Sequence, residues 1–184
     1  MLIGSTNRPA KLTGQPAEDE ALRKPISYFN ANCSSCHGDY GSYWGEGFAA
    51  DYDMKELSEV VDEMAAGPGF APLEGEALAV QTAYNESVAK KLPFAVAFKD
   101  GDSWRGEATP KATLKVDGKP VQLDGHTWSA PAGGATELSV TLGDITRTVK
   151  LTGDKVVWTK ADHDDTTTQP TTNPITKPAS RPAD

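Results

Sequence analysis

The sequence is poor in the residues from which many active sites are built. Its 184 residues include only two cysteines, three histidines and three methionines. A zinc site would need a second cysteine or histidine pair to complete four ligands, and the chain has none. No apolar run approaches the ~18 residues that a membrane span requires. Met1 to Gly14 lacks the apolar centre of a secretion signal, so we expect that a signal was removed or that the chain is a fragment of a longer protein.

Basic residues are scarce in the first half of the chain. The formal net charge is −8, and between Glu18 and Leu92 there are 14 Asp and Glu against 5 Lys and Arg. Pro93 to Lys160 is close to neutral. An acidic surface repels phosphate backbones and anionic lipid, which argues against nucleic acid and membrane surfaces as partners. We expect a partner protein with a basic face.

Composition divides the chain into four segments. They are a polar N-terminal arm (1–17), a segment with helical periodicity (18–92), a segment rich in Thr, Val and Gly turns (93–160) and a Thr/Pro-rich tail (161–184). Proline recurs every four residues near the chain end, with almost nothing apolar to bury, at Pro170, Pro174, Pro178 and Pro182. The last segment is therefore predicted to be a disordered linker or tail.

Three helices are predicted within the second segment. The first begins at Pro25, because proline is tolerated at a first helical position. The second follows Asp53, which forms an acidic capping box with Glu56, and its apolar stripe comprises Met54, Leu57, Val60, Val61 and Met64. The third follows a break at residues 67–72, and its stripe comprises Ala77, Val80, Tyr84 and Val88.

The third segment is predicted to be a small antiparallel β-sandwich of the immunoglobulin-like kind. Short β-type runs occupy residues 112–116, 120–123, 126–130, 137–142, 145–151 and 155–159, and turn signals separate them. A segment of this size is near the lower limit for an independent core, so it could be stabilised by packing against the helices.

The chemistry of the chain is concentrated in Cys33, Cys36 and His37. Two thiols three residues apart in a helical turn project to the same side and can form thioethers with the two vinyl groups of one haem. The next residue then supplies an imidazole to the iron. A thiol-disulfide motif would need a strand before it, and a disulfide across two residues closes too small a loop to stabilise much. The spacing therefore indicates one covalently attached haem c.

Residues 18–92 resemble a single-haem class I cytochrome c. The resemblance rests on ISYFNANCSSCHGD at Ile26 to Asp39, a glycine-rich loop, KELSEVVDEM, and GPGFAPLEGEALAVQTAYNESV. It implies an all-α domain around the haem, followed here by the β-sandwich and the tail. It also implies thioethers at Cys33 and Cys36, a proximal ligand at His37, and maturation outside the cytoplasm. A periplasmic, cell-surface or secreted location follows from that.

The sequence does not decide which residue is the sixth iron ligand. Members of that family usually place a methionine before a Pro-x-Phe-like segment, and here Gly67 directly precedes Pro68. Met64 is the nearest candidate, and a thioether there would suit outer-sphere electron transfer. Met54 is an alternative, and so is an open site, because the helical stripe explains both sulfurs as core residues.

The expected function is electron transfer without bond chemistry on a substrate. One alternative is a polysaccharide- or protein-binding β-sandwich, with the helical part feeding electrons to an attached oxidoreductase. Another is a haem-based sensor or peroxidase with an open sixth site. Aromatic residues after the motif are expected to wall the porphyrin, with one of them contacting a propionate, and these are Tyr40, Tyr43, Trp44 and Phe48.

The sequence gives less support for a functional role of the remaining tryptophans and histidines. Trp104, Trp128 and Trp158 are candidates either for a sugar-binding platform or for the sandwich core. His126 is expected to be solvated in a turn. His163 lies in an acidic cluster that could bind a cation weakly or serve only solubility.

Overall fold

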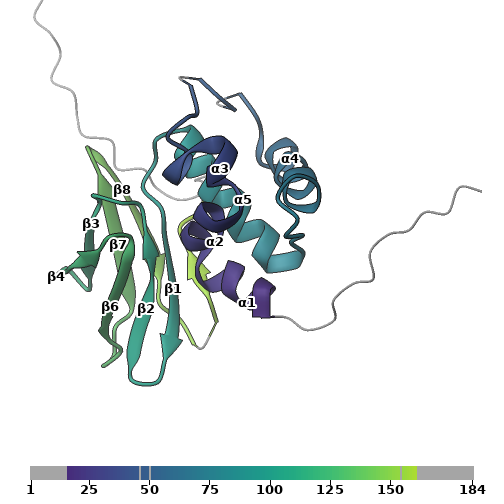
Figure 1. The fold of residues 1–184 in the computed structure, drawn as a ribbon. Helices are drawn as coiled ribbons and strands as arrows, with labels where there is room; N and C mark the ends of the chain where they lie inside the picture. Colours follow the sequence, from purple (N-terminus) through teal and green to yellow (C-terminus); the bar gives the residue numbers. More distant parts are fainter. Residues whose placement is uncertain (1–15, 46, 50, 154, 161–184) are drawn as a thin grey trace, which may run out of the picture.

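The computed structural model describes residues 16–45, 47–49, 51–153 and 155–160. The predicted tail at 161–184, including His163, lies outside the described residues, as do the first 15 residues of the predicted arm. The helices are gathered on one side of the molecule and the strands on the other (Figure 1).

Two of the helices, those that start at Pro25 and after Asp53, begin where local sequence signals place them. They are α1 (Pro16–Arg23), α2 (Pro25–Asn32), α3 (Ser34–His37), the 3-10 turn η1 (Asp39–Gly41), α4 (Met54–Ala66) and α5 (Gly75–Ala89). The predicted start at Pro25 is confirmed. The capping box is also confirmed, since the Asp53 carboxylate accepts from the backbone N–H groups of Lys55 and Glu56 at 2.8 Å each. Helix α1 was not predicted.

Among the described residues, nine strands form two antiparallel sheets. The first sheet has the order β5-β6-β2-β1-β9 and the second β4-β3-β7-β8. The strands are β1 (Ala95–Asp100), β2 (Ser103–Ala108), β3 (Thr113–Val116), β4 (Lys119–Val121), β5 (Leu123–Asp124), β6 (Thr127–Pro131), β7 (Glu137–Leu142), β8 (Ile145–Lys150) and β9 (Val157–Trp158). The β1–β2 hairpin was missing from the predicted strands.

Strand β1 belongs to two cores at once. Ala95 and Ala97 point into the core between the two sheets, whereas Val96 points to the other face and packs with Ile26, Phe29 and other residues of α2 and α5. Phe94, just before the strand, joins the same helical core, and its ring lies 5.4 Å from that of Tyr84 between centroids.

The predicted fold class is therefore wrong. The chain is a small α+β fold with two antiparallel sheets and short helices, not an all-α domain followed by a β-sandwich. The reason is that the first half of β1, Ala95 to Ala97, is buried on both faces, so that the helices use the outer face of the first sheet as one wall of their own core.

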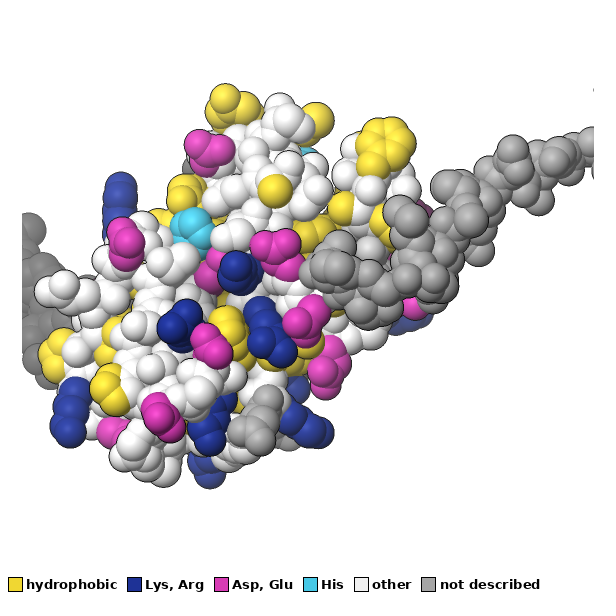
Figure 2. Space-filling model, turned by 60° about the horizontal axis from the view of Figure 1, so that its bottom comes forward, with side chains coloured by type: hydrophobic (Ala, Val, Ile, Leu, Met, Phe, Trp, Pro, Cys, Tyr) yellow, Lys and Arg dark blue, Asp and Glu magenta, His cyan; other side chains and the backbone are white. Residues whose placement is uncertain are grey.

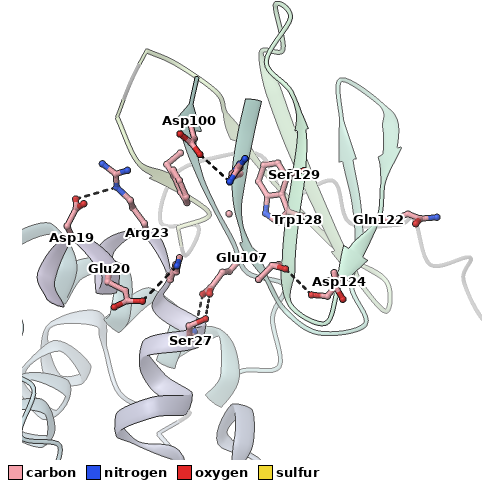
Figure 3. A pocket seen from close by; sticks show the side chains of 15 residues that line it. Asp19, Glu20, Arg23, Ser27, Asp100, Glu107, Gln122, Asp124, Trp128 and Ser129 are labelled. Carbon is pink, nitrogen blue, oxygen red and sulfur yellow. Dashed lines mark hydrogen bonds and ion pairs between the residues drawn. The ribbon is translucent and has the colours of Figure 1, made fainter. Parts of the chain in front are cut away.

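A buried carboxylate ties the helices to the sheet. Glu107 on β2 is only 1% exposed and stands opposite Val96 in the sheet register. Its carboxylate accepts from the backbone N–H groups of Ile26 at 2.7 Å and Ser27 at 3.1 Å, and also from the Ser27 hydroxyl (Figure 3). It thereby caps the start of α2, where Lys24 provides no side-chain cap.

Candidate functional site

Helices α2 and α3 place the cysteine–histidine motif at the mouth of a cavity. The backbone N–H of Cys33 donates to the Phe29 carbonyl at the end of α2, and that of His37 donates to the Cys33 carbonyl at 3.0 Å. Cys33 and His37 therefore lie one turn apart, and both line the cavity. Cys36 is exposed and is not among the lining residues.

The cavity has mainly apolar walls from α2, α4, α5 and the loop after η1. The space open to water-sized molecules is about 80 Å³, inside a wider gap of about 550 Å³ that reaches solvent. A flat macrocycle would have to part these walls, to which Phe48 and Met64 contribute side chains that are 44% and 47% exposed. Besides Cys33 and His37 the lining comprises Tyr28, Phe29, Trp44, Phe48, Leu57, Val60, Val61, Met64, Ala65, Leu73, Gln81 and Asn85.

Trp44 fixes the tautomer of His37. Its indole Nε1 donates to His37 Nδ1 at 2.7 Å, and the two rings meet edge to face. A neutral imidazole carries one ring proton, so that proton resides on Nε2 of His37. A metal bound at Nε2 would require the proton to leave, or to move to Nδ1 once the Trp44 hydrogen bond breaks.

The environment of Cys33 is unlike that of a thiol-disulfide catalyst. Burial, with a smaller contribution from Cys36, raises the pKa of the Cys33 thiol to about 11. Catalytic Cys-X-X-Cys pairs have a lowered pKa, because the thiolate is the reactive form. Cys33 is therefore a protonated, poorly reactive thiol at neutral pH, which argues against a role as a redox catalyst.

The two candidate methionines occupy different places on α4. Met64 lines the cavity and is 47% exposed, so it is not a buried core residue. Met54 is the first residue of the helix, half-buried, and does not line the cavity. The structure thus brings Met64, but not Met54, to the same cavity as His37.

The aromatic residues after the motif divide into two groups. Trp44 and Phe48 line the cavity, with ring centroids 4.9 Å apart. Tyr43 is mostly exposed, and the Tyr40 hydroxyl contacts His126 Nδ1 at 3.2 Å. His126 is not solvated as expected, because Ser27 Oγ lies 3.0 Å from its Nε2 and the Glu107 carboxylate 3.4 Å away.

Gln81 on α5 was missed by the sequence reasoning. It lines the cavity, is 1% exposed, and neither its amide nitrogen nor its amide oxygen has a hydrogen-bond partner in the described structure. The sequence does contain a pattern that marks Gln81 as unusual. Gln81 lies four residues after Ala77 and three before Tyr84, so a polar side chain interrupts the predicted buried stripe.

A larger, open groove lies between α1 and the first sheet. Both arginines of its lining are paired with acidic residues of the same lining, Arg105 with Asp100 at 3.2 Å and Arg23 with Asp19 at 3.3 Å (Figure 3). Figure 2 shows acidic and basic side chains interspersed on this side of the molecule, without a patch of one sign. The groove therefore selects no ligand by charge, and the cavity beside the motif is the better candidate site.

The tryptophans of the β segment do not form an exposed platform. Trp104 and Trp128 are 3% and 4% exposed and belong to the core between the sheets. Trp158 packs against the helical core. Stacking on a sugar ring needs an exposed aromatic face, so the buried Trp104 and Trp128 are core residues.

Comparisons with known proteins place the chain in no family. A scan against protein-family models, a search of curated proteins and a search of solved structures each found no match. Within the described residues no group of three or more His, Cys, Asp and Glu could hold a metal ion, and no helix is long and apolar enough to cross a bilayer.

The resemblance to class I cytochromes c is accordingly corrected. No family model supports it, and residues 18–92 form part of an α+β fold instead of a separate all-α domain. What remains is the motif itself, at Cys33, Cys36 and His37, together with the cavity beside it.

Proposed function

We propose that this protein carries one haem, attached by thioethers at Cys33 and Cys36, and transfers single electrons. The observation that supports it best is that Cys33 and His37 line one apolar cavity that also holds an unpaired polar side chain. The residue types fit the group, since a thiol can bond a vinyl group, an imidazole can bind iron and apolar walls can contact the ring. Cys33 and His37 line the cavity, whereas Cys36 lies outside its lining and would have to turn toward the ring as the walls part. The proposal requires no membership of a known family.

The haem would supply an iron that cycles between Fe(II) and Fe(III), and the chain's own residues would control its surroundings. Cys33 and Cys36 would hold the ring, and His37 would donate its Nε2 lone pair to the metal. The His37 ring proton would then lie on Nδ1, so the hydrogen bond from Trp44 would be broken and Trp44 would serve as a wall of the cavity. The walls from α2, α4 and α5 would exclude water, which tunes the reduction potential. Because haem is attached to thiols outside the cytoplasm, the proposal includes a periplasmic or cell-surface location.

Met64 is proposed as the second side chain that would bind the haem iron. The oxidised, matured protein is then expected to show the weak absorption band near 695 nm that marks sulfur ligation of haem iron, and Met64→Ala is expected to lose it. Met54→Ala is the matched control, because Met54 lies on the same helix but away from the cavity, and it should keep the band. A wild-type spectrum without the band would instead favour an open site suited to sensing or peroxide chemistry.

The proposed redox partner docks through a basic face. Helix α4, beside the cavity, exposes four acidic residues against one lysine, namely Glu56, Glu59, Asp62 and Glu63 against Lys55. Such a surface steers encounter more than it tightens a complex. Electron-transfer rates with a basic redox protein should therefore fall several-fold between 10 and 200 mM salt, because the Debye length shrinks from ~30 Å at 10 mM to less than ~8 Å. A rate independent of salt would contradict this docking mode.

A further inference from the structure

The cavity contains a polar side chain that nothing in the polypeptide satisfies. Gln81 is 1% exposed, yet both its amide Nε2 and its amide Oε1 lack a hydrogen-bond partner in the described structure. A buried amide without partners destabilises a fold, and few such groups survive in native proteins without a reason.

The neighbouring polar residues of α5 show how such side chains are normally accommodated. The Thr82 hydroxyl donates to the Leu78 carbonyl at 2.8 Å, Asn85 Nδ2 to the Gln81 carbonyl at 2.8 Å, and the Ser87 hydroxyl to the Tyr84 carbonyl at 2.7 Å. Each of these bonds is made to the helix's own backbone. The Gln81 amide makes no such bond, although Gln81 lines the cavity that Cys33 and His37 also line.

We propose that the Gln81 amide binds a carboxyl side chain of the haem, an inference that rests on the proposed function. The carboxyl side chains are the polar substituents of an otherwise apolar ring, and one of them buried in this cavity needs a hydrogen-bonding partner. The Gln81 Nε2 would donate to an ionised carboxylate, which only accepts, and its Oε1 would accept from the O–H of a protonated carboxyl group. Gln81 is thus a positioning residue that fixes the ring within the cavity.

The test uses the matured, haem-bearing protein and the sign of a change in melting temperature. Removing a paired amide destabilises a protein, whereas removing an unpaired buried amide stabilises it. Gln81→Leu is expected to lower Tm by about 2 to 6 °C, and to shift both the Soret band and the midpoint potential. Gln81→Met, of similar shape, should do the same, and it serves if the leucine variant does not mature.

Thr82→Val is the matched control. Thr82 is equally buried on the same helix, but its hydroxyl is bonded within the helix and it does not line the cavity. It should lower Tm slightly and leave the Soret band and midpoint potential unchanged.

Two results would overturn the inference. An unchanged or raised Tm in both Gln81 variants would mean that the amide has no partner in the mature protein. A lowered Tm with an unaltered Soret band and potential would mean that a buried water, not the haem, is the partner. Either result leaves the proposed function standing, which fails only if the matured wild-type chain bears no covalent haem.

Discussion

Replacing Cys33 and Cys36 together by serine is expected to abolish covalent haem attachment completely. The hydroxyl of serine does not form the thioether, and His37 alone would hold the ring only through its iron. After maturation with haem, the denatured double variant should release all pigment into acidified organic solvent, whereas the wild type keeps it on the polypeptide. Mass spectrometry of the denatured chains provides the second measurement.

The control for this experiment lies between the two cysteines. Ser35 is exposed, and its side chain makes only a 3.9 Å contact with the Cys36 sulfur, so Ser35→Ala should mature like the wild type. Pigment that stays on the denatured double variant, or pigment absent from the wild type, would contradict haem attachment at this motif.

Replacing Glu107 by alanine is expected to cost about 3 to 5 kcal/mol of unfolding free energy. The carboxylate accepts from two backbone N–H groups at the start of α2 and from the Ser27 hydroxyl, and removing it leaves these donors without an acceptor inside the protein. The loss is measured as a lower urea midpoint at unchanged slope.

Two further variants separate capping from other effects of the Glu107 substitution. Glu107→Gln keeps an oxygen that can accept from the helix and should lose less than half as much stability. Glu137→Ala removes an exposed glutamate from β7 and should change the unfolding free energy by no more than about 0.5 kcal/mol. If Glu107→Ala were as stable as Glu137→Ala, the carboxylate would not hold α2 to the sheet.

Local structure could be predicted from the sequence because its causes are local. Pro25 and the Asp53–Glu56 pair mark helix starts that the structure confirms. The role of Cys33, Cys36 and His37 as a haem attachment motif stays a prediction, and the structure places Cys33 and His37, but not Cys36, in the lining of one cavity. The place of Met64 beside the cavity followed only from the structure, because a helical stripe does not reveal which sulfur stays exposed.

Tertiary contacts explain what could not be predicted. In strand β1, helices cover one face and the second sheet covers the other, so its sequence lacks the alternation of apolar and polar residues by which a strand is predicted. The bond from Glu107 to Ile26 spans 81 residues, and no local pattern announces it. These two contacts explain why the structure is one α+β fold and not the predicted helical domain followed by a β-sandwich.

Because β1 contributes side chains to two cores, evolutionary substitutions in the sheet are coupled to substitutions in the helices. A larger side chain at Val96 would press on Ile26 and Phe29, and through α2 on the turn that bears Cys33. Such a change could persist in evolution only with compensating replacements in the helices. Epistasis between the sheet and the residues around the cysteine–histidine motif is therefore built into the architecture.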